Sequence, residues 1–415
     1  MAGPIRHPIN QANLERYLEE HVPEIKTPLD IKQFGFGQSN PTYQLTSATG
    51  IRYVLRKKPP GKLLSKAAHK VEREYRVMRA IGEANAKGSS GVQVPVPKTY
   101  CLCEDDTVVG TPFYVMEFLD GRIFEDFSIP EVDAKTRTAM WTDAVRTLAK
   151  LHSIDPASIG LASFGKDTDF YTRQIKTWST ICEAQSAVRD VDSGALVGPL
   201  PHMEELVSYF ADPERQPADR ATLVHGDFKI DNLVFHKTEP RVIGILECTK
   251  KKSMRKVEKS APINDARSWE MSTIGHPLSD LSNLLTAFTT APATDSPLTT
   301  AKSSLSNPAF VPGKTPGLPT RGELIAMYAS ASASAAQGKG TGYDPRPGGE
   351  VSWGAAFNLF RLAAVCQGIA ARHAVRQASS AKAAIHAAER GPLAELAWAL
   401  IVDREKERKG NKARL

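Results

Sequence analysis

Short apolar runs alternate with turn residues between residues 28 and 119, and this pattern predicts a small lobe rich in β-strands. The strand-like runs contain many β-branched and aromatic residues and lie at residues 31–36, 42–46, 51–56, 99–102 and 113–119. Between the third and fourth runs, Val71, Tyr75 and Met78 follow helical spacing and predict a helix over residues 66–81. A short amphipathic helix is expected at residues 11–20, within an N-terminal extension of residues 1–27.

Helical patterns dominate from residue 120 onward. Helices are predicted at residues 134–153 and 353–388, and two strands joined by a turn are predicted at residues 222–246. A stretch rich in Pro, Ser and Thr at residues 291–320 is typical of a long, flexible surface loop. We therefore expect an α+β protein with two lobes, in which a larger helical lobe covers residues 120–402 and a basic tail covers residues 403–415.

Charge is concentrated in two segments of this chain, which has 415 residues and a formal net charge of +7. Residues 248–268 carry a net charge of +5 and residues 403–415 carry +3, which leaves about −1 for the rest of the chain. A general basic surface is therefore not expected. This distribution argues against a protein that binds the phosphate backbone of nucleic acids.

The five cysteines form no CxxC pair and have no His at the spacing of a zinc site. Their odd number indicates a reducing compartment. The N-terminal residues mix charge into every short window, and no apolar run approaches the ~20 residues that a membrane span requires. We therefore expect a soluble, intracellular protein with no membrane span and no nucleic-acid partner.

The segment LVHGDFKIDNLVF, residues 223–235, places polar residues on a tight loop between two apolar runs. Phosphoryl transfer to a hydroxyl needs a carboxylate that deprotonates the acceptor, a cation that offsets the γ-phosphate charge, and an oxygen ligand for Mg²⁺. Asp227, Lys229 and Asn232 offer these groups at the spacing found in protein kinases. An alternative is a plain turn, because Gly, Asp and Asn are common turn residues.

A glycine-containing loop lies between the first two predicted strands, where a loop that folds over ATP phosphates would lie. Its candidate phosphate-binding residues are Gly35, Gly37, Gln38, Ser39 and Asn40. Backbone N–H groups and the Ser39 hydroxyl could donate hydrogen bonds to phosphate oxygens. The pattern fits a plain hairpin turn equally well.

Two further pairs of residues lie where a kinase fold contacts its nucleotide. Arg56 ends the run YVLR and Glu74 lies on the next predicted helix, so the two could form the ion pair that holds the α- and β-phosphates. Glu117 and Phe118 end an apolar run, where backbone groups could hydrogen-bond adenine. Each pair alone is also compatible with solvated charges or an ordinary core strand.

The order and intervals of these motifs resemble the aminoglycoside-phosphotransferase and choline-kinase-like family, and within it the kinase-like domain of acyl-CoA dehydrogenase family members ten and eleven. Similar stretches are GQSNPTY, YVLRKKPPGKLL, FYVMEFLDGRIF, HGDFKIDN and WEMSTIGHPLSDL. The resemblance implies a two-lobed protein-kinase-like fold that uses ATP and Mg²⁺. It implies Asp227 as the catalytic base, Asn232 as a magnesium ligand, Arg56 with Glu74 as the phosphate-binding pair, and Asp280 as a brace for the catalytic loop.

The chain departs from this family where a second magnesium ligand is expected. In such kinases the strand after the catalytic loop ends in an Asp, followed in this subfamily by Trp-Glu. Here the strand ends in Glu247, and residues 248–268 intervene before Trp269. Glu247 is therefore the second candidate metal ligand. Its longer side chain moves the carboxylate by roughly an ångström, and such a misplacement can cost about a hundredfold in rate.

We hypothesise that residues 248–268 are translated from an unspliced intron. If Glu247 is encoded by GAG and Ser268 by AGC or AGT, removal of about 63 bases with GT and AG ends restores an Asp codon. Sequencing the messenger RNA across codons 240 to 275 tests this hypothesis. Detection of the long form alone would refute it.

The resemblance also implies a substrate class, a hydroxyacyl-CoA phosphorylated at its 4-hydroxyl. Because the chain shows no room for a fused dehydrogenase domain, we expect any acyl-CoA dehydrogenase partner to be a separate protein. Two alternatives stay open. One is a kinase for a choline-like, sugar or aminoglycoside hydroxyl, and the other is an impaired nucleotide-binding protein in which residues 248–268 are genuine.

The C-terminal tripeptide Ala413-Arg414-Leu415 resembles the SKL-type peroxisomal address. An ordinary solvated tail is the alternative reading of these three residues. We therefore expect a peroxisomal protein, or otherwise a cytoplasmic one.

Overall fold

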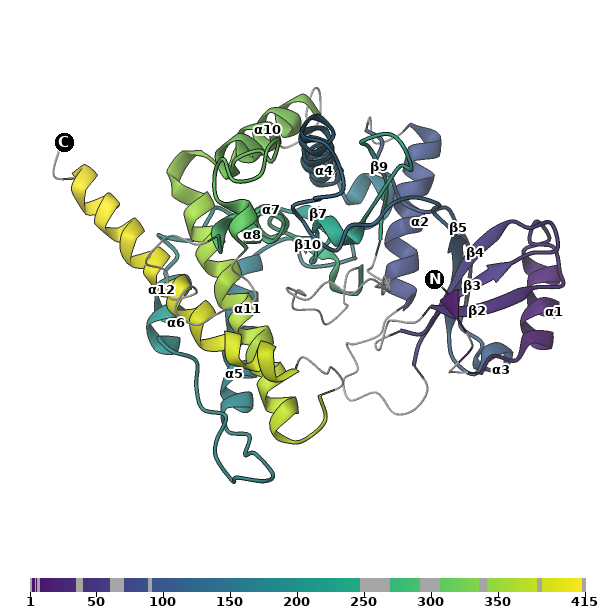
Figure 1. Cartoon of the computed structure of the whole chain (residues 1–415), viewed down its shortest axis with the longest axis horizontal. Coiled ribbons are helices and arrows are strands. Elements are labelled where there is room, and N and C mark those ends of the chain that lie inside the picture. Colours follow the sequence, from purple (N-terminus) through teal and green to yellow (C-terminus); the bar gives the residue numbers. More distant parts are fainter. Residues whose placement is uncertain are drawn as a thin grey trace.

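The computed structural model describes residues 2–3, 5, 8–34, 40–59, 71–88, 92–246, 269–291, 307–335, 342–378 and 383–412. Four features expected from the sequence lie outside the described residues: the phosphate loop at residues 35–39, Glu247, the segment 248–268 and the tripeptide 413–415. The described part of the chain forms a small β-rich lobe and a larger helical lobe (Figure 1). The predicted two-lobed α+β fold is therefore confirmed.

The small lobe is built on an antiparallel sheet of six strands in the order β1-β2-β3-β4-β6-β5. Its strands are β1 (Ala2–Gly3), β2 (Asp30–Phe34), β3 (Thr42–Thr46), β4 (Arg52–Lys57), β5 (Thr99–Cys103) and β6 (Phe113–Glu117). Because side chains alternate along a strand, the two faces of the sheet pack against different helices. Tyr53 and Leu55 pack against α1 (Gln11–His21), while Val54 faces α2 (Val71–Lys87).

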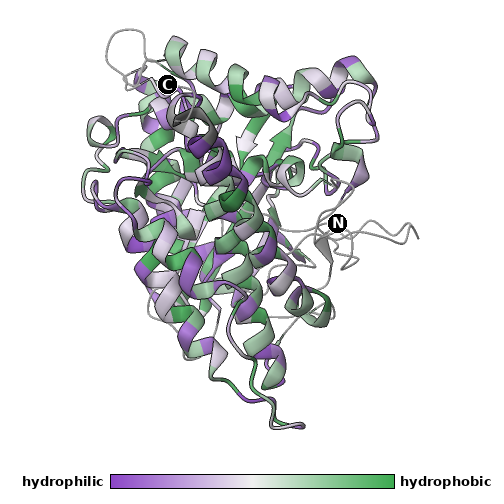
Figure 2. Ribbon diagram, turned by 90° about the vertical axis from the view of Figure 1, so that its left-hand side faces the viewer, coloured by the Kyte–Doolittle hydropathy of each residue, from purple (hydrophilic) through white to green (hydrophobic). Residues whose placement is uncertain are grey.

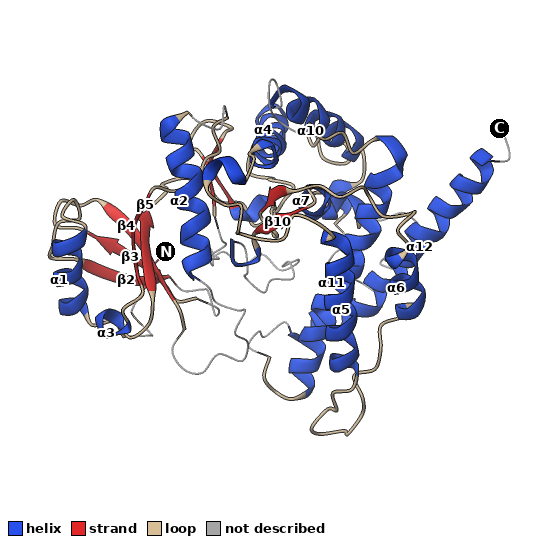
Figure 3. Cartoon of the chain, turned by 180° about the vertical axis from the view of Figure 1, so that it is seen from behind, coloured by secondary structure: helices blue, strands red, loops and turns tan. Residues whose placement is uncertain are grey.

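The predicted elements of this lobe are close to the observed ones. The helix expected at residues 66–81 is observed from Val71 and continues to Lys87. The loop between the last two strands contains one short helix, α3 (Asp106–Val109), whose N-cap is the Asp105 side chain. Figure 3 shows α1 and α3 beside the sheet and α2 between the sheet and the large lobe.

The large lobe consists of helices around two short antiparallel strand pairs. The helices are α4 (Ala134–Ser153), α5 (Phe170–Ser186), α6 (Met203–Ala211), α7 (Leu278–Leu284), α8 (Thr286–Thr289), α10 (Arg321–Ala335), α11 (Glu350–Ala374) and α12 (Ala383–Lys412). The short 3₁₀ helices are η1 (Ala157–Ile159), η2 (Ile230–Asn232), η3 (Trp269–Met271), η4 (Pro308–Phe310) and η5 (Pro347–Gly349). Strand β7 (Thr222–Val224) pairs with β10 (Thr273–Gly275), and β8 (Leu233–Phe235) pairs with β9 (Val242–Ile245). Figure 2 shows apolar and polar segments alternating along these helices, as expected for amphipathic helices that cover a core.

The single helix predicted over residues 353–388 is wrong, because two helices are observed there. Helix α11 ends at Ala374, Arg376 follows with a positive φ of 58°, and α12 begins at Ala383. Helix α11 is long and apolar enough to cross a membrane, but 78% of its most apolar window is buried inside the protein. It packs against α5, α7 and α12, so it is a core helix of this lobe.

Two segments expected to be loop or tail contain defined structure in their described parts. Within residues 291–320, the ring of Phe310 is buried against Trp141 and Phe288. The Pro- and Thr-rich composition gave no sign of this aromatic anchor. Residues 403–412 of the expected basic tail continue α12, and the end of this helix projects from the lobe in Figure 1.

Candidate active site

The loop that carries Asp227 leaves β7, turns sharply at Gly226 and enters η2. Gly226 has a φ of +92°, in the left-handed region that favours glycine. A Cβ atom at this position would lie 2.7 Å from the Cβ of Met271 and 3.0 Å from its carbonyl oxygen. Both the turn and the close approach of η3 therefore require glycine at residue 226.

The buried carboxylate of Asp280 binds the backbone of this loop, as the resemblance implied. Asp280 of α7 accepts hydrogen bonds from the backbone N–H groups of His225 at 2.6 Å and Gly226 at 2.8 Å. Its Oδ2 also lies 3.3 Å from Nε2 of His152, whose Nδ1 lies 2.7 Å from the Tyr328 hydroxyl. Burial alone would raise the pKa of Asp280, but the interactions with His152 and His225 outweigh it and lower that pKa. The expected brace is confirmed.

The structure brings the two candidate catalytic residues and the candidate metal ligand Asn232 together around one carboxylate. Oδ2 of Asp227 lies 3.1 Å from Nζ of Lys229 and 3.1 Å from Nδ2 of Asn232. The Asn232 amide nitrogen also donates to the Asp227 carbonyl at 2.7 Å. Oδ1 of Asp227 accepts a hydrogen bond of 3.2 Å from Nδ2 of Asn283, on α7. Asp227 is 19% exposed, so its carboxylate is fixed by donors yet can still be reached from solvent.

In the small lobe, Arg56 of β4 and Glu74 of α2 form a buried ion pair. Arg56 Nε lies 2.9 Å from Glu74 Oε2, and the two side chains are 4% and 0% exposed. Glu74 also accepts hydrogen bonds from the Tyr114 hydroxyl at 2.8 Å and from Nδ2 of Asn40 at 3.1 Å. Asn40, expected to bind phosphate, therefore supports Glu74 in this structure. These donors compensate for the loss of water around the carboxylate.

A cavity of about 120 Å³ lies between the two lobes and contains the remaining candidate nucleotide-binding residues. Arg56, Glu117 and Phe118 line it from the small lobe, and Leu246 and Trp269 line it from the large lobe. The cavity therefore joins the buried ion pair to the strand end at which adenine was expected to bind.

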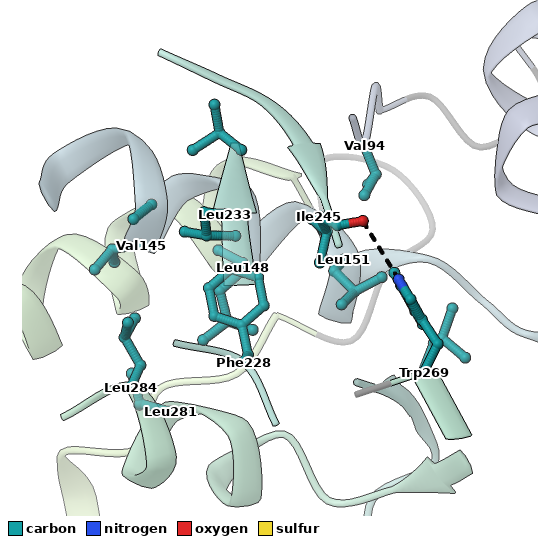
Figure 4. Close-up of a cluster of buried hydrophobic side chains, with 14 of the residues drawn as sticks. Val94, Val145, Leu148, Leu151, Phe228, Leu233, Ile245, Trp269, Leu281 and Leu284 are labelled. Carbon is teal, nitrogen blue, oxygen red and sulfur yellow. Dashed lines mark hydrogen bonds between the residues drawn. The ribbon is translucent and has the colours of Figure 1, made fainter. Parts of the chain in front are cut away.

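Two segments that flank residues 247–268 lie next to each other at this cavity. The indole Nε1 of Trp269 donates a hydrogen bond of 3.3 Å to the carbonyl oxygen of Ile245, at the end of β9 (Figure 4). The backbone N–H of Leu246 donates to the Asn232 carbonyl at 2.8 Å. The last described residue before Glu247 is therefore bonded to the candidate metal ligand Asn232.

The donor atoms needed for a magnesium site are present in part among the described residues. The amide nitrogen of Asn232 is bonded to Asp227, which places its amide oxygen on the other side of the group. Amide and carboxylate oxygens are the ligands that Mg²⁺ prefers. Asn232 fits the role of a ligand, whereas its expected partner Glu247 lies outside the described residues.

Comparison with known proteins identifies the family. The family model of the phosphotransferase enzyme family, APH, matches residues 30–248, more than half of the chain. The chain belongs to this family. The match includes Arg56, Glu74 and the loop that runs from Asp227 to Asn232. It ends at residue 248, where the segment 248–268 begins.

Matches to curated relatives cover almost the whole chain. Acyl-CoA dehydrogenase family member 11 of Rattus norvegicus is 35% identical over 396 residues, covering 94% of this chain and 43% of the relative. Family member 10 of Mus musculus is 34% identical over 407 residues, covering 94% and 31%. The chain thus spans less than half the length of these curated relatives.

A solved structure supports the same fold. The crystal structure of an aminoglycoside-phosphotransferase homologue from Ralstonia eutropha has a TM-score of 0.71 and 31% sequence identity, and the match covers 95% of this chain and 98% of that protein. The phosphotransferase fold therefore extends through the helical lobe, beyond the residues that the family model matches.

Sequence reasoning did not find several residues that contact the candidate site. The Tyr114 hydroxyl donates to Glu74, and the His152 ring contacts Asp280. Asn283 donates to Asp227 and in turn accepts a hydrogen bond from Arg361. The pattern SDLSN placed Asn283 close to the expected brace, which was one usable signal. Arg361 gave no signal, because its helix reads as an ordinary apolar core helix.

Proposed function

We propose that this protein transfers the γ-phosphoryl group of ATP to a hydroxyl of a small metabolite. The observation that carries the proposal is the Asp227 carboxylate, held by Lys229, Asn232 and Asn283 on a loop braced by Asp280. Phosphoryl transfer depends mainly on positioning and on electrostatic stabilisation. A carboxylate that is fixed by donors and still accessible meets the first of these needs.

Asp227 acts on the acceptor in this proposal. Its carboxylate accepts the proton of the acceptor hydroxyl, and the acceptor oxygen then forms a bond to the γ-phosphorus of ATP. The bond between that phosphorus and the bridging oxygen of ADP breaks, and ADP leaves. Lys229, 3.1 Å from Asp227, offsets negative charge on the transferring group.

Arg56 and Glu74 serve the nucleotide side. The ion pair fixes the direction of the guanidinium, and Arg56 lines the interlobe cavity. A guanidinium presents several N–H donors in a rigid plane that suits phosphate oxygens. We assign the adenine end of the nucleotide to the strand end at Glu117 and Phe118, which line the same cavity.

Mg²⁺ would be held by the Asn232 amide oxygen and by residue 247. When bound, Mg²⁺ neutralises charge on the β- and γ-phosphates. In this proposal the Asn232 side chain uses both ends of its amide group. The nitrogen donates to the Asp227 carboxylate, and the oxygen is the ligand for Mg²⁺.

The proposed acceptor class is suggested by the names of the relatives, which are acyl-CoA dehydrogenase family members. A hydroxyacyl-CoA with a 4-hydroxyl group is the first acceptor to test. We propose the enzyme class of a phosphotransferase with an alcohol group as acceptor, since Asp227 is a carboxylate that can accept the proton of a hydroxyl.

Residues 248–268 bear directly on whether the 415-residue chain is active. Ile245 and Trp269 lie near the two ends of this segment and are joined by a hydrogen bond, so a much shorter connection would fit between them. The family match also ends at residue 248. Both observations support the hypothesis that a single Asp replaces residues 247–268 in the active form.

The test is Mg-ATP-dependent phosphorylation of a 4-hydroxyacyl-CoA by two proteins, the 415-residue chain and a chain in which one Asp replaces residues 247–268. Phosphorylated product from the shortened chain, abolished by Asp227→Asn, supports the kinase assignment. Product from the shortened chain alone also supports the intron hypothesis. If neither chain phosphorylates the thioester, a choline-like, sugar and aminoglycoside panel follows, and no product from any acceptor contradicts the proposed function.

A further inference from the structure

A buried arginine lies behind the catalytic loop and contacts Asp227 through one intervening side chain. Arg361, on α11, is 9% exposed, and its Nη2 donates a hydrogen bond of 2.6 Å to Oδ1 of Asn283. On the other side of the same amide, Nδ2 of Asn283 donates to Oδ1 of Asp227 and to the Phe228 carbonyl, both at 3.2 Å. The three side chains form a continuous hydrogen-bonded line from α11 to the reacting carboxylate.

We propose that Arg361 is a positioning residue for phosphoryl transfer, which acts through Asn283 to fix the Asp227 carboxylate. The inference rests on the proposed function, in which Asp227 is the base. Hydrogen-bond chemistry gives the reason. An arginine side chain can only donate, so it requires the amide oxygen of Asn283 to face it. The amide nitrogen must then face Asp227, where it is a donor to the carboxylate.

Without Arg361, the amide of Asn283 could rotate by half a turn. Its oxygen would then face the Asp227 carboxylate, two acceptors would meet, and the carboxylate would have to move. A small displacement of a reacting group can lower a rate strongly, because the geometry of attack is lost. Arg361, together with the Phe228 carbonyl on the nitrogen side, thus stabilises the amide orientation that supports catalysis.

Arg361 itself is held from the other side. Asn358, one helical turn earlier, accepts hydrogen bonds from Arg361 Nε at 3.3 Å and Nη2 at 3.0 Å. The Asn358 amide nitrogen donates to the Thr286 hydroxyl at 2.9 Å, which fixes the orientation of this second amide. Both amides present oxygen to the guanidinium. Arg361 is therefore confined on α11 against the helix pair that carries Asn283.

The charge of Arg361 is not neutralised by direct contact with a carboxylate among the described residues. Its oxygen partners there are amide oxygens of Asn283 and Asn358, while Asp227 and Asp280 act on it electrostatically from further away. A buried cation that gains only neutral partners is costly for the fold. That cost is consistent with selection for a role at the active site.

The experiment is a double-mutant cycle on phosphoryl transfer, in whichever of the two chains above is active. Arg361→Met and Asn283→Ala should each lower kcat about 10- to 100-fold, as expected for the loss of one hydrogen bond to a charged group. Arg361→Met should have little further effect in the Asn283→Ala background, since its action passes through Asn283. The KM for ATP should change little, and Arg361→Lys should recover part of the activity.

A matched control lies on the same helix. Gln367 is fully buried and donates to the Gly198 carbonyl, remote from Asp227, so Gln367→Ala should affect stability but not kcat. Multiplicative effects of Arg361→Met and Asn283→Ala on kcat would overturn the inference. An equal loss of kcat in Gln367→Ala would also overturn it, because it would show that any damage to α11 has the same effect.

A second readout does not depend on activity and is made on the 415-residue chain. The side-chain amide protons of Asn283 are both hydrogen-bonded, so their NMR signals should exchange slowly with water and should be absent in Asn283→Ala. Arg361→Met should speed this exchange at least tenfold. Unchanged exchange would overturn the inference even if phosphoryl transfer were found. Faster exchange without any transfer would support Arg361 as the group that orients Asn283 and count against the proposed function alone.

Discussion

At the scale of single residues, the site is stabilised by charged and polar groups that have lost their water. Glu74 and Asp280 are both fully buried, and each accepts at least two hydrogen bonds from fixed donors. Removal of one partner of such a group leaves an uncompensated buried charge. The residues that we propose to position the phosphates and the catalytic loop are therefore also residues on which folding depends.

This dependence predicts a large effect for Glu74→Ala. The substitution leaves Arg56 buried without its ion-pair partner, and the free energy of unfolding should fall by about 3 to 5 kcal/mol. Glu83→Ala on the same helix is the matched control, since Glu83 and Arg79 form an exposed pair worth at most about 1 kcal/mol. Urea unfolding of the two variants measures the difference. Equal, small losses would contradict the buried-pair account.

Two buried histidines predict how stability depends on pH. Burial lowers the pKa of His225 to about 4 and the pKa of His276 to about 3. The unfolded chain therefore binds more protons than the folded one between about pH 6.5 and 4, so stability falls as pH falls through this window, by about 1.4 kcal/mol per pH unit for each histidine.

The free energy of unfolding measured from pH 7 to 4 checks this slope. In His276→Gln the slope should decrease, because one buried base has been removed. A slope that is the same in His276→Gln and in the parent chain would show that burial of His276 is not its cause.

At the scale of elements, helices with a continuous apolar stripe are predicted well, whereas a helix end without a Gly or Pro is missed. Residues 134–153 were predicted as a helix and form α4 over the same range, because their apolar stripe is continuous. The turn between α11 and α12 was not predicted. It contains Arg376 at positive φ rather than a Gly or Pro, so the alanine-rich pattern continued through it.

The same distinction applies to the site. Asp227, Lys229 and Asn232 lie within one loop, so their spacing in the sequence was enough to predict that they are close together. The structure shows the contacts among them. Arg361 is 78 residues from Asn283 in sequence, and only the packing of α11 against α7 joins them. No local pattern encodes that contact.

The catalytic loop predicts a strong effect of Gly226→Ala. Alanine at a φ of +92° is strained, and its Cβ would also meet Met271, so η3 must move. Gly50→Ala is the matched control, because Gly50 has a similar φ of +80° but open space around the new methyl group. Gly50→Ala should cost about 1 to 2 kcal/mol of unfolding free energy. Gly226→Ala should cost more and should also lower phosphoryl transfer; equal costs in unfolding experiments would contradict the packing argument.

At the scale of the whole molecule, the two lobes meet at the cavity that Arg56 and Trp269 line. Residues 247–268 are flanked by Ile245 and Trp269 at this junction. The described residues next to this segment therefore lie where the proposed nucleotide site meets the large lobe. The family match covers residues 30–248 and ends as this segment begins.

The most direct test of the account is the effect of Asp227→Asn on the rate of phosphoryl transfer from ATP. Loss of a general base typically costs about 10²- to 10⁴-fold in rate. The account predicts such a loss in kcat, with ATP affinity retained within a few-fold in a calorimetric titration, because Arg56 and Glu74 are untouched. A variant that transfers phosphate at a rate close to that of the parent chain would show that Asp227 is not the base and would contradict the central claim.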